Sequence, residues 1–199
     1  RRVVFAASAA AYGNDPRVPK REDMRPTPES PYAISKLVGE YYCGAYSGLY
    51  GLETVCLRYF NVYGPCQDPA SPYSGVISIF AKRMLNGQAP LVHGDGLQTR
   101  DFVSVHDVVA ANMLAYQVEC AQGQVYNIGS GHSSSLIDLL KALNAVLSCN
   151  IQAEFVEARS GDVRDSLADI SKAQSQLGYM SSMDLLRGLR EIVEWMRAE

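Results

Sequence analysis

The chain has 199 residues, of which 47% are hydrophobic and 20% are charged, and this suffices for one domain or two small ones with a real core. Its formal net charge is −3 at pH 7 and both signs are mixed along the sequence, so no basic stripe indicates a nucleic-acid partner. No stretch approaches the roughly 18 uninterrupted apolar residues of a membrane span, so we expect no membrane partner either.

The cysteine content is typical of a reducing compartment. The chain has five cysteines, an odd number, and none of them forms a C-x-x-C pair. We therefore expect free thiols and a cytoplasmic location. The histidines lack the spacing of metal ligands, and we predict no metal site.

The first predicted elements alternate between strand and helix. An apolar strand over residues 1–7 leads into a proline-rich connector that cannot be helical. A helix is predicted over residues 32–49, because Ser30 is a good N-cap and Pro31 suits the first helical position. The run 52–60 has the β-branched content of a buried parallel strand. This alternation is typical of a doubly wound α/β fold.

The helix predicted over residues 32–49 has apolar positions on more than one face. These positions are Leu37, Val38, Tyr41, Tyr42, Ala45 and Leu49. We therefore expect the helix to pack on the sheet and against a second subunit, which predicts a homodimer.

The rest of the chain continues in the same manner, without internal repeats or low-complexity tracts. The predicted elements are a helix from about residue 75 to 86, a strand around Leu91, a strand over 100–105, a helix over 106–119, a strand over 125–128, a helix over 136–147, a strand over 153–156 and two closing helices.

Tyr32 and Lys36 are one helical turn apart and therefore share a face. An unperturbed phenol loses its proton near pH ~10, so a tyrosine base at neutral pH needs its phenolate stabilised by about 4 kcal/mol. Lys36, the positive end of the helix and the charged ring of a bound nicotinamide cofactor all favour the phenolate. Ser8 ends the first strand and is placed to reach the same spot. In a chain with twelve tyrosines the spacing also arises by chance, with a lysine lying along a tyrosine.

Two segments resemble the active-site signature of extended short-chain dehydrogenase/reductases that act on nucleotide sugars, namely FAASAAAYG at residues 5–13 and SPYAISK at residues 30–36. UDP-hexose 4-epimerases are the most similar members, and the resemblance extends over nearly the whole chain. It implies that Ser8, Tyr32 and Lys36 are catalytic, that the cofactor is NAD, and that Tyr32 and Lys36 also bind this cofactor.

The first segment departs from the family at one point. Ala9 and Ala10 stand where many relatives carry further hydroxyls, which leaves Ser8 as the only serine to serve. Nucleotide-sugar dehydratases and decarboxylases share the tyrosine and lysine but usually add acidic residues beside the serine. The alanines therefore argue against a dehydratase.

The segment Arg58–Asn61, RYFN, resembles the part of the family whose asparagine holds the substrate diphosphate. The resemblance implies that Asn61 binds the substrate and that Tyr59 contacts the cofactor. An amide suits this task because it donates to an anionic oxygen without adding charge. From the residues alone, Asn61 is equally an Asx turn that ends a strand.

Three more substrate contacts follow from the resemblance. Arg100, in the segment TRDF at residues 99–102, corresponds to an arginine that grips the diphosphate, a task that suits its planar fork. Leu91 and His93 fall where the family places backbone and side chain against the uracil. Without the family, these residues read as a tight turn with a surface ion pair and a surface histidine.

The segment RSGD at residues 159–162 matches the family motif R-x-G-D. It implies that Arg159 is a second arginine on the diphosphate and that Asp162 lies near the ribose. Ser166 falls at the position that gates the pocket beside the 2-substituent of the sugar, where a small side chain leaves room for an N-acetyl group. Without the family, residues 159–162 read as an ordinary turn. The alternative for Ser166 is that it begins a strand and faces away from the sugar.

The sequence lacks the glycine-rich turn on which a dinucleotide pyrophosphate rests. The nearest candidate is the run 129–134, GSGHSS, which has a serine in place of the third glycine and which we interpret as a turn with a serine cap. At ~30 residues per βαβ unit, matching the family leaves on the order of 100 residues upstream of this chain. We therefore expect a fragment that binds NAD poorly on its own.

These observations predict the C-terminal portion of a doubly wound Rossmann-like sheet with an interleaved smaller lobe. Residues 1–60 and 100–129 are expected to form a partial NAD-binding domain, and residues 61–99 and 130–199 a lobe that binds the nucleotide sugar. The predicted activity is 4-epimerisation of a UDP-hexose or UDP-N-acetylhexosamine. A dehydratase or decarboxylase and a non-catalytic binding fragment remain as alternatives.

Overall fold

The computed structural model describes residues 1–71, 74–158 and 163–198. Its centre is a parallel sheet with the strand order β1-β2-β7, formed by Arg2–Ser8, Glu53–Tyr59 and Gln124–Ile128. Successive side chains of a strand point to opposite faces, so Val55 and Leu57 of β2 face one side of the sheet while Arg58 faces the other. The predicted α/β class is confirmed.

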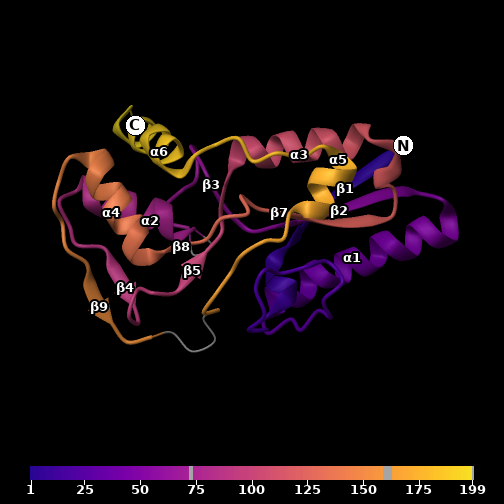
Figure 1. The fold of residues 1–199 in the computed structure, drawn as a ribbon, viewed down its shortest axis with the longest axis horizontal. Helices are drawn as coiled ribbons and strands as arrows, with labels where there is room; N and C mark the ends of the chain where they lie inside the picture. Colours follow the sequence, from indigo (N-terminus) through magenta and orange to yellow (C-terminus); the bar gives the residue numbers. More distant parts are fainter. Residues whose placement is uncertain (72–73, 159–162, 199) are drawn as a thin grey trace.

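Helices cover both faces of this sheet (Figure 1). α1 (Pro31–Tyr50) lies on one face, and α3 (Val105–Gln117) and α5 (Ser171–Leu177) lie on the other. The second face encloses a core that joins strand and helix side chains, among them Val55, Leu57, Tyr126, Ile128, Val108, Ala111, Ala115, Ala173 and Leu177.

Three further helices pack together beside the sheet and form what we call the helical lobe, namely α2 (Val76–Leu85), α4 (Leu136–Leu147) and α6 (Leu185–Ala198) (Figure 1). They bury a second core, and the single tryptophan of the chain, Trp195, packs against it from α6 while partly buried. β4 (Leu91–His93) and β9 (Glu154–Val156) form a parallel pair in this region.

Short strands connect the sheet to the helical lobe. β3 (Asn61–Tyr63) pairs in parallel with β6 (Phe102–Ser104), and β5 (Thr99–Arg100) pairs antiparallel with β8 (Ser134–Ser135). The remaining elements are the 3-10 helices η1 (Ala9–Tyr12) and η2 (Glu119–Ala121). β3, β8 and the 3-10 helices were not predicted from the sequence.

Two predicted strands differ from the structure. The run 52–60 corresponds to β2, and a further strand, β3, follows it directly. The two are separate because the Phe60 N–H donates to the Ile128 carbonyl of β7 whereas the Asn61 N–H donates to the Asp101 carbonyl. The run 100–105 becomes β5 and β6, and α3 begins at Val105, one residue earlier than predicted. The chain therefore changes partner strands just where it leaves the central sheet.

α1 contacts the sheet through one face only. Its buried residues are Ala33, Leu37 and Glu40. Of the apolar positions that we expected to be covered, Val38, Tyr41, Tyr42 and Leu49 are exposed. Within this single chain these four side chains are therefore not covered, and their cover by a second subunit stays a prediction.

In the part of the chain that the structure describes, no helix combines the length and the apolar character needed to cross a bilayer. The division of the chain into a cofactor part and a sugar part stays a prediction. α5, which that division assigns to the sugar part, packs with β7 of the central sheet.

Candidate active site

The N-terminus of α1 places two functional side chains on one face. Ser30 caps the helix by accepting from the Ala33 N–H at 3.1 Å, as predicted. Lys36 Nζ lies 5.8 Å from the centre of the Tyr32 ring. The same ammonium donates to the Ala6 carbonyl of β1 at 2.9 Å, which holds it against the sheet. Tyr32 is 49% exposed, so its phenol is open to a bound molecule.

Ser8 approaches from the sheet. It is the last residue of β1, and its Oγ accepts from the Ala10 N–H at 3.2 Å, which caps η1. Among residues 1–71, 74–158 and 163–198 no acceptor is recorded for its hydroxyl hydrogen. Ser8 can therefore donate a hydrogen bond to a ligand without breaking a bond of its own.

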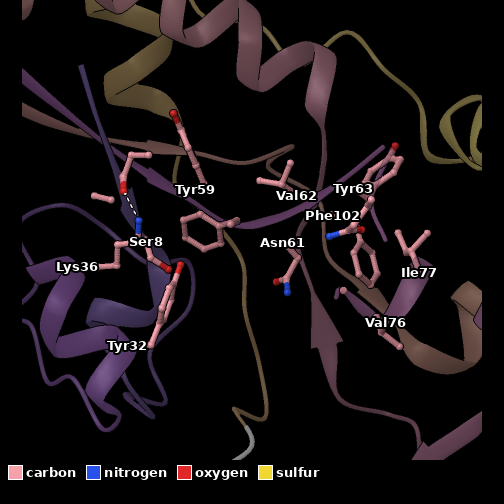
Figure 2. A pocket seen from close by; sticks show the side chains of 15 residues that line it. Ser8, Tyr32, Lys36, Tyr59, Asn61, Val62, Tyr63, Val76, Ile77 and Phe102 are labelled. Carbon is pink, nitrogen blue, oxygen red and sulfur yellow. Dashed lines mark hydrogen bonds between the residues drawn. The ribbon is translucent and has the colours of Figure 1, made fainter. Parts of the chain in front are cut away.

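Ser8, Tyr32 and Lys36 line one wall of a pocket with a volume of about 510 Å³, and we call these three residues the sheet wall (Figure 2). Asn61 of β3, Gln67 of the following loop and Val76 at the start of α2 also line it, and we call them the helix wall. The other lining residues are Ala6, Ala7, Tyr59, Phe60, Val62, Tyr63, Gly75, Ile77 and Phe102. The pocket lies at the carboxyl ends of β1 and β2, where parallel sheets bind their ligands.

The helix wall is suited to an anion. The N-cap of α2 is Gly75, which has no side chain to accept from the first turn. The first N–H groups of a helix have no intrahelical acceptor, and the helix dipole is positive at this end. Such an end attracts a phosphate. Beside it, Gln67 Oε1 accepts from Ser78 Oγ at 2.5 Å, which leaves the Gln67 amide nitrogen available to donate.

Two other tyrosines line the pocket but are poor proton acceptors. The Tyr59 hydroxyl donates to Asn112 Oδ1 of α3 at 3.0 Å, and burial raises the pKa of Tyr59. Burial, with the nearby charge of Asp107, raises the pKa of Tyr63 as well. A phenol with a raised pKa keeps its proton, so neither Tyr59 nor Tyr63 is suited to accept one.

Four predicted substrate residues do not line the pocket. Leu91 and His93 lie in β4, where His93 Nδ1 is 3.1 Å from the Glu157 carbonyl. Arg100 Nη1 donates to its neighbouring Thr99 carbonyl at 2.8 Å. The Ser166 N–H donates to the same carbonyl at 3.2 Å, so Arg100 and Ser166 lie on adjacent segments. The predicted residues Arg159 and Asp162 lie outside the described residues.

The glycine-containing turn after β7 donates hydrogen bonds to the buried carboxylate of Asp101. Buried Asp101 accepts from the Ser130 N–H at 2.7 Å, from Ser130 Oγ at 2.7 Å, from the Gly131 N–H at 3.1 Å and from the Ala168 N–H at 3.0 Å. A Cβ on Gly129 would lie 2.6 Å from Asp101 Oδ2, which explains the glycine. Burial raises the pKa of Asp101 although these donors favour its charge. The turn is therefore no phosphate cradle, because its N–H groups are already bound.

Sequence reasoning missed Gln67, Val76 and Phe102. A glycine before an apolar helix is a weak signal, and no local pattern shows that the helix start faces Tyr32 from across a pocket. Among the described residues, no group of three or more His, Cys, Asp or Glu side chains is placed to hold a metal ion.

Comparison with known proteins gives a consistent result. A model of the NAD dependent epimerase/dehydratase family matches residues 1–129. A putative UDP-glucose 4-epimerase of Methanocaldococcus jannaschii is 42% identical over 197 residues, which cover 98% of this chain and 63% of that protein. The chain thus spans less than two thirds of the length of this relative.

Solved structures agree over the same length. A UDP-N-acetylglucosamine 4-epimerase from Methanobrevibacter ruminantium, in complex with UDP-N-acetylmuramic acid, superposes with a TM-score of 0.95 at 38% identity, covering 99% of this chain and 63% of that one. A UDP-glucuronic acid 4-epimerase from Bacillus cereus, in complex with UDP-glucuronic acid and NAD, superposes with a TM-score of 0.89 at 30% identity, covering 99% and 62%. With a family model that matches residues 1–129, the chain belongs to the NAD-dependent epimerase/dehydratase family.

Proposed function

We propose that the protein carrying this chain is a nucleotide-sugar 4-epimerase that uses NAD, and that this chain is its C-terminal part. The observation that carries the proposal is the pocket between the two walls. A hydroxyl, a phenol and an ammonium on the sheet wall face an uncapped helix N-terminus and two amide side chains on the helix wall. The relatives that bind UDP-sugars support the same reading.

In the proposed mechanism the sheet wall handles the proton at the sugar 4-oxygen. Ser8 donates a hydrogen bond to this oxygen, and the Tyr32 phenolate takes the proton of the 4-hydroxyl. NAD, when bound, would supply the acceptor for the hydride of carbon 4 and its return to the other face of the turned 4-keto sugar, so that carbon 4 is inverted with no net oxidation. Tyr32 gives its proton back to the 4-oxygen. Lys36 holds the cofactor ribose and places a positive charge near the phenolate.

The described residues fit one end of the proposed cofactor. Lys36 and Tyr32 offer an ammonium and a phenol in the lining of the pocket, which suits a ribose and a nicotinamide. The pyrophosphate end finds no glycine-rich cradle in the described part of the chain, because the turn at Gly129 is bound to Asp101. We therefore propose that the pyrophosphate binds to a part of the protein outside this chain.

The substrate we propose is a UDP-hexose or a UDP-N-acetylhexosamine. Its diphosphate would lie against the start of α2 and Asn61. Arg100 and Arg159 stay proposed contacts to the diphosphate. Asp162 stays a proposed contact to the ribose, and Leu91 and His93 to the uracil, with Tyr59 beside the cofactor. Ser166 stays the proposed gate at the sugar 2-substituent.

The decisive experiment is an epimerisation assay of the full-length protein with UDP-glucose and UDP-N-acetylglucosamine in heavy water. We expect inversion at carbon 4 without deuterium at that carbon, because the hydride returns from the cofactor rather than from solvent. A dehydratase would instead release water and incorporate solvent deuterium into a deoxy product. Absence of both products would contradict the proposal.

The second candidate, a non-catalytic binding fragment, concerns this chain on its own. The turn at Gly129 favours it, because its N–H groups are bound to Asp101. The described residues then offer no glycine-rich cradle for the cofactor pyrophosphate. Calorimetric titration of the 199-residue chain with NAD tests it, and we expect no measurable binding. Micromolar affinity would contradict the reading of this chain as a part that lacks its cofactor site.

We propose further that the protein is a cytoplasmic homodimer in which a second copy covers α1. Support comes from exposed apolar side chains on this helix, namely Ile34, Val38, Tyr41, Tyr42, Tyr46, Leu49 and Tyr50. The five thiols, none of them in a disulfide, support a reducing compartment. Sedimentation of the full-length protein and of its Tyr42→Glu variant tests the dimer, and a monomeric wild type would contradict it.

A further inference from the structure

A buried ion pair joins the helix that carries Tyr32 to the central sheet. Arg58 of β2 donates from Nε to Glu40 Oε1 of α1 at 2.9 Å and from Nη2 to Glu40 Oε2 at 2.6 Å. The two side chains are only 5% and 4% exposed. Such buried pairs add little net stability, because desolvation of the charges offsets their attraction. Two parallel bonds of a planar fork do, however, fix the orientation of the groups that they join.

Glu40 belongs to the same helix face as the sheet-wall residues of α1. Tyr32, Lys36 and Glu40 follow one another at intervals of four residues, so they lie in a row along the helix. Fixing the Glu40 carboxylate to β2 therefore fixes both the rotation of α1 about its axis and its height above the sheet. At Gly39, a Cβ would lie 2.2 Å from the Phe5 ring of β1, so the helix is also seated closely at this point.

The same guanidinium contacts the segment that follows Ser8. Arg58 Cζ lies 4.8 Å from the centre of the Tyr12 ring, and Tyr12 ends η1, the 3-10 helix that Ser8 caps. The Tyr12 hydroxyl donates to Asn127 Oδ1 of β7 at 2.7 Å, which locks the ring in place. One side chain thus touches the two segments that carry Ser8 and Tyr32.

One nitrogen of the Arg58 guanidinium is buried without a hydrogen bond to any described residue, which packing alone would not favour. Its Nη1 is buried and has no hydrogen-bond partner among residues 1–71, 74–158 and 163–198. An unpaired N–H away from water costs stability. Burial by itself would lower the pKa of Arg58, but the hydrogen bond with Glu40 and nearby charges outweigh burial and raise it, so the guanidinium stays charged.

We infer that Arg58, with Glu40, is a positioning residue that sets the separation between the Tyr32 phenol and the Ser8 hydroxyl on the sheet wall. The inference rests on the proposed function, in which both groups act on the same sugar oxygen. Neither Arg58 nor Glu40 lines the pocket, so their effect reaches the substrate only through α1 and η1.

The test uses the full-length protein and two variants at this pair. Arg58→Met with Glu40→Leu removes both charges and leaves no unpaired one, so the fold is expected to persist. Arg58→Lys keeps a cation for Glu40 but loses the fork and the stacking on Tyr12. For both we expect kcat to fall about 10- to 100-fold, because small displacements of reacting groups are costly. KM for the sugar nucleotide should stay within about threefold of wild type.

The matched control is Leu177→Ala in α5, a buried residue of the other face of the sheet. It should lower the melting temperature and leave kcat unchanged. An equal loss of kcat in this control would overturn the inference, because general destabilisation would then explain the effect. A rise in KM alone in the pair variants, or wild-type kcat in folded Arg58→Lys, would overturn it as well. If the double variant fails to fold, Arg58→Lys decides.

Crystal structures of wild type and Arg58→Lys provide a readout that does not depend on turnover. We expect the distance between Tyr32 Oη and Ser8 Oγ to differ between them, and an unchanged distance would overturn the inference. A wild type that epimerises no UDP-sugar would contradict the proposed function alone, and the two structures would still decide the role of Arg58.

Discussion

The two walls of the pocket differ in the kind of group that they present. The sheet wall holds Ser8, Tyr32 and Lys36, whose side chains donate or exchange protons. The helix wall holds the amides of Asn61 and Gln67 and the backbone N–H groups at the start of α2, which donate hydrogen bonds but do not change their charge. One wall is therefore equipped for chemistry and the other for binding.

This difference has a kinetic meaning. A group that changes its protonation state during the reaction stabilises the transition state more than the bound substrate, and its loss lowers kcat. A neutral donor to a diphosphate contacts substrate and transition state equally, and its loss raises KM. Variants on the two walls of the full-length protein should therefore separate into these two classes.

The largest effect is expected for Tyr32→Phe on the sheet wall. Without the phenol oxygen, no pocket residue is placed to take the proton, and we expect kcat to fall at least ~1,000-fold with KM within about threefold. Steady-state kinetics with UDP-glucose measures both. Tyr116→Phe, at an exposed tyrosine of α3, is the control and should behave as wild type. Substantial turnover by Tyr32→Phe would remove this residue as the base.

On the helix wall, Asn61→Leu should have the next largest effect. Loss of a hydrogen bond to a charged oxygen should raise KM about 10- to 100-fold, with kcat nearly unchanged. The same assay, together with calorimetric affinity for UDP, measures it. A fall in kcat at constant KM would break the division between the two walls.

Ser166→Tyr should change preference rather than activity. If Ser166 gates the space beside the sugar 2-substituent, a tyrosine should lower kcat/KM for UDP-N-acetylglucosamine relative to UDP-glucose by about 10-fold or more. For wild type we expect the N-acetylated substrate to be accepted at least as well as the plain one. Ser166 does not line the pocket. If Ser166→Tyr leaves the ratio of kcat/KM between the two substrates unchanged, Ser166 faces away from the sugar.

The smallest effects are expected at Gln67 and at Ser78, which is hydrogen-bonded to it. The Gln67 amide nitrogen is one neutral donor among several, so Gln67→Leu should raise KM only about threefold to tenfold. Ser78→Ala, which releases the Gln67 carbonyl, should have a smaller effect in the same direction. If the two substitutions combined exceed the effect of Gln67→Leu alone, Ser78 acts on the substrate by another route than through Gln67.

Local signals in the sequence were sufficient for the sheet wall. Ser30 and Pro31 fixed the start of α1, and the helical period then placed Lys36 beside Tyr32, as the structure confirms. The order of strands and helices was also readable, because apolar runs and their periods are local properties. The ends of β2 and β6 could not be read from the sequence. They depend on which partner strand accepts the backbone N–H of the following residue.

Contacts between distant segments could not be read from the sequence. Glu40 and Arg58 are 18 residues apart, and nothing near either one announces a bidentate pair. The turn at Gly129 resembles a phosphate site in composition, and only the position of Asp101 shows that its N–H groups are occupied. Arg100 was singled out by resemblance, and the structure places it beside Ser166 rather than in the pocket.

The position of Trp195 gives the protein a built-in optical probe. It is the only tryptophan of the chain, and it packs against the core formed by α2, α4 and α6, away from the central sheet. Its emission therefore reports the state of the helical lobe alone within this chain. Far-ultraviolet circular dichroism, in contrast, reports the helices of the whole chain. Fluorescence and circular dichroism recorded in the same melt would show whether the helical lobe comes apart together with the rest of the chain or separately.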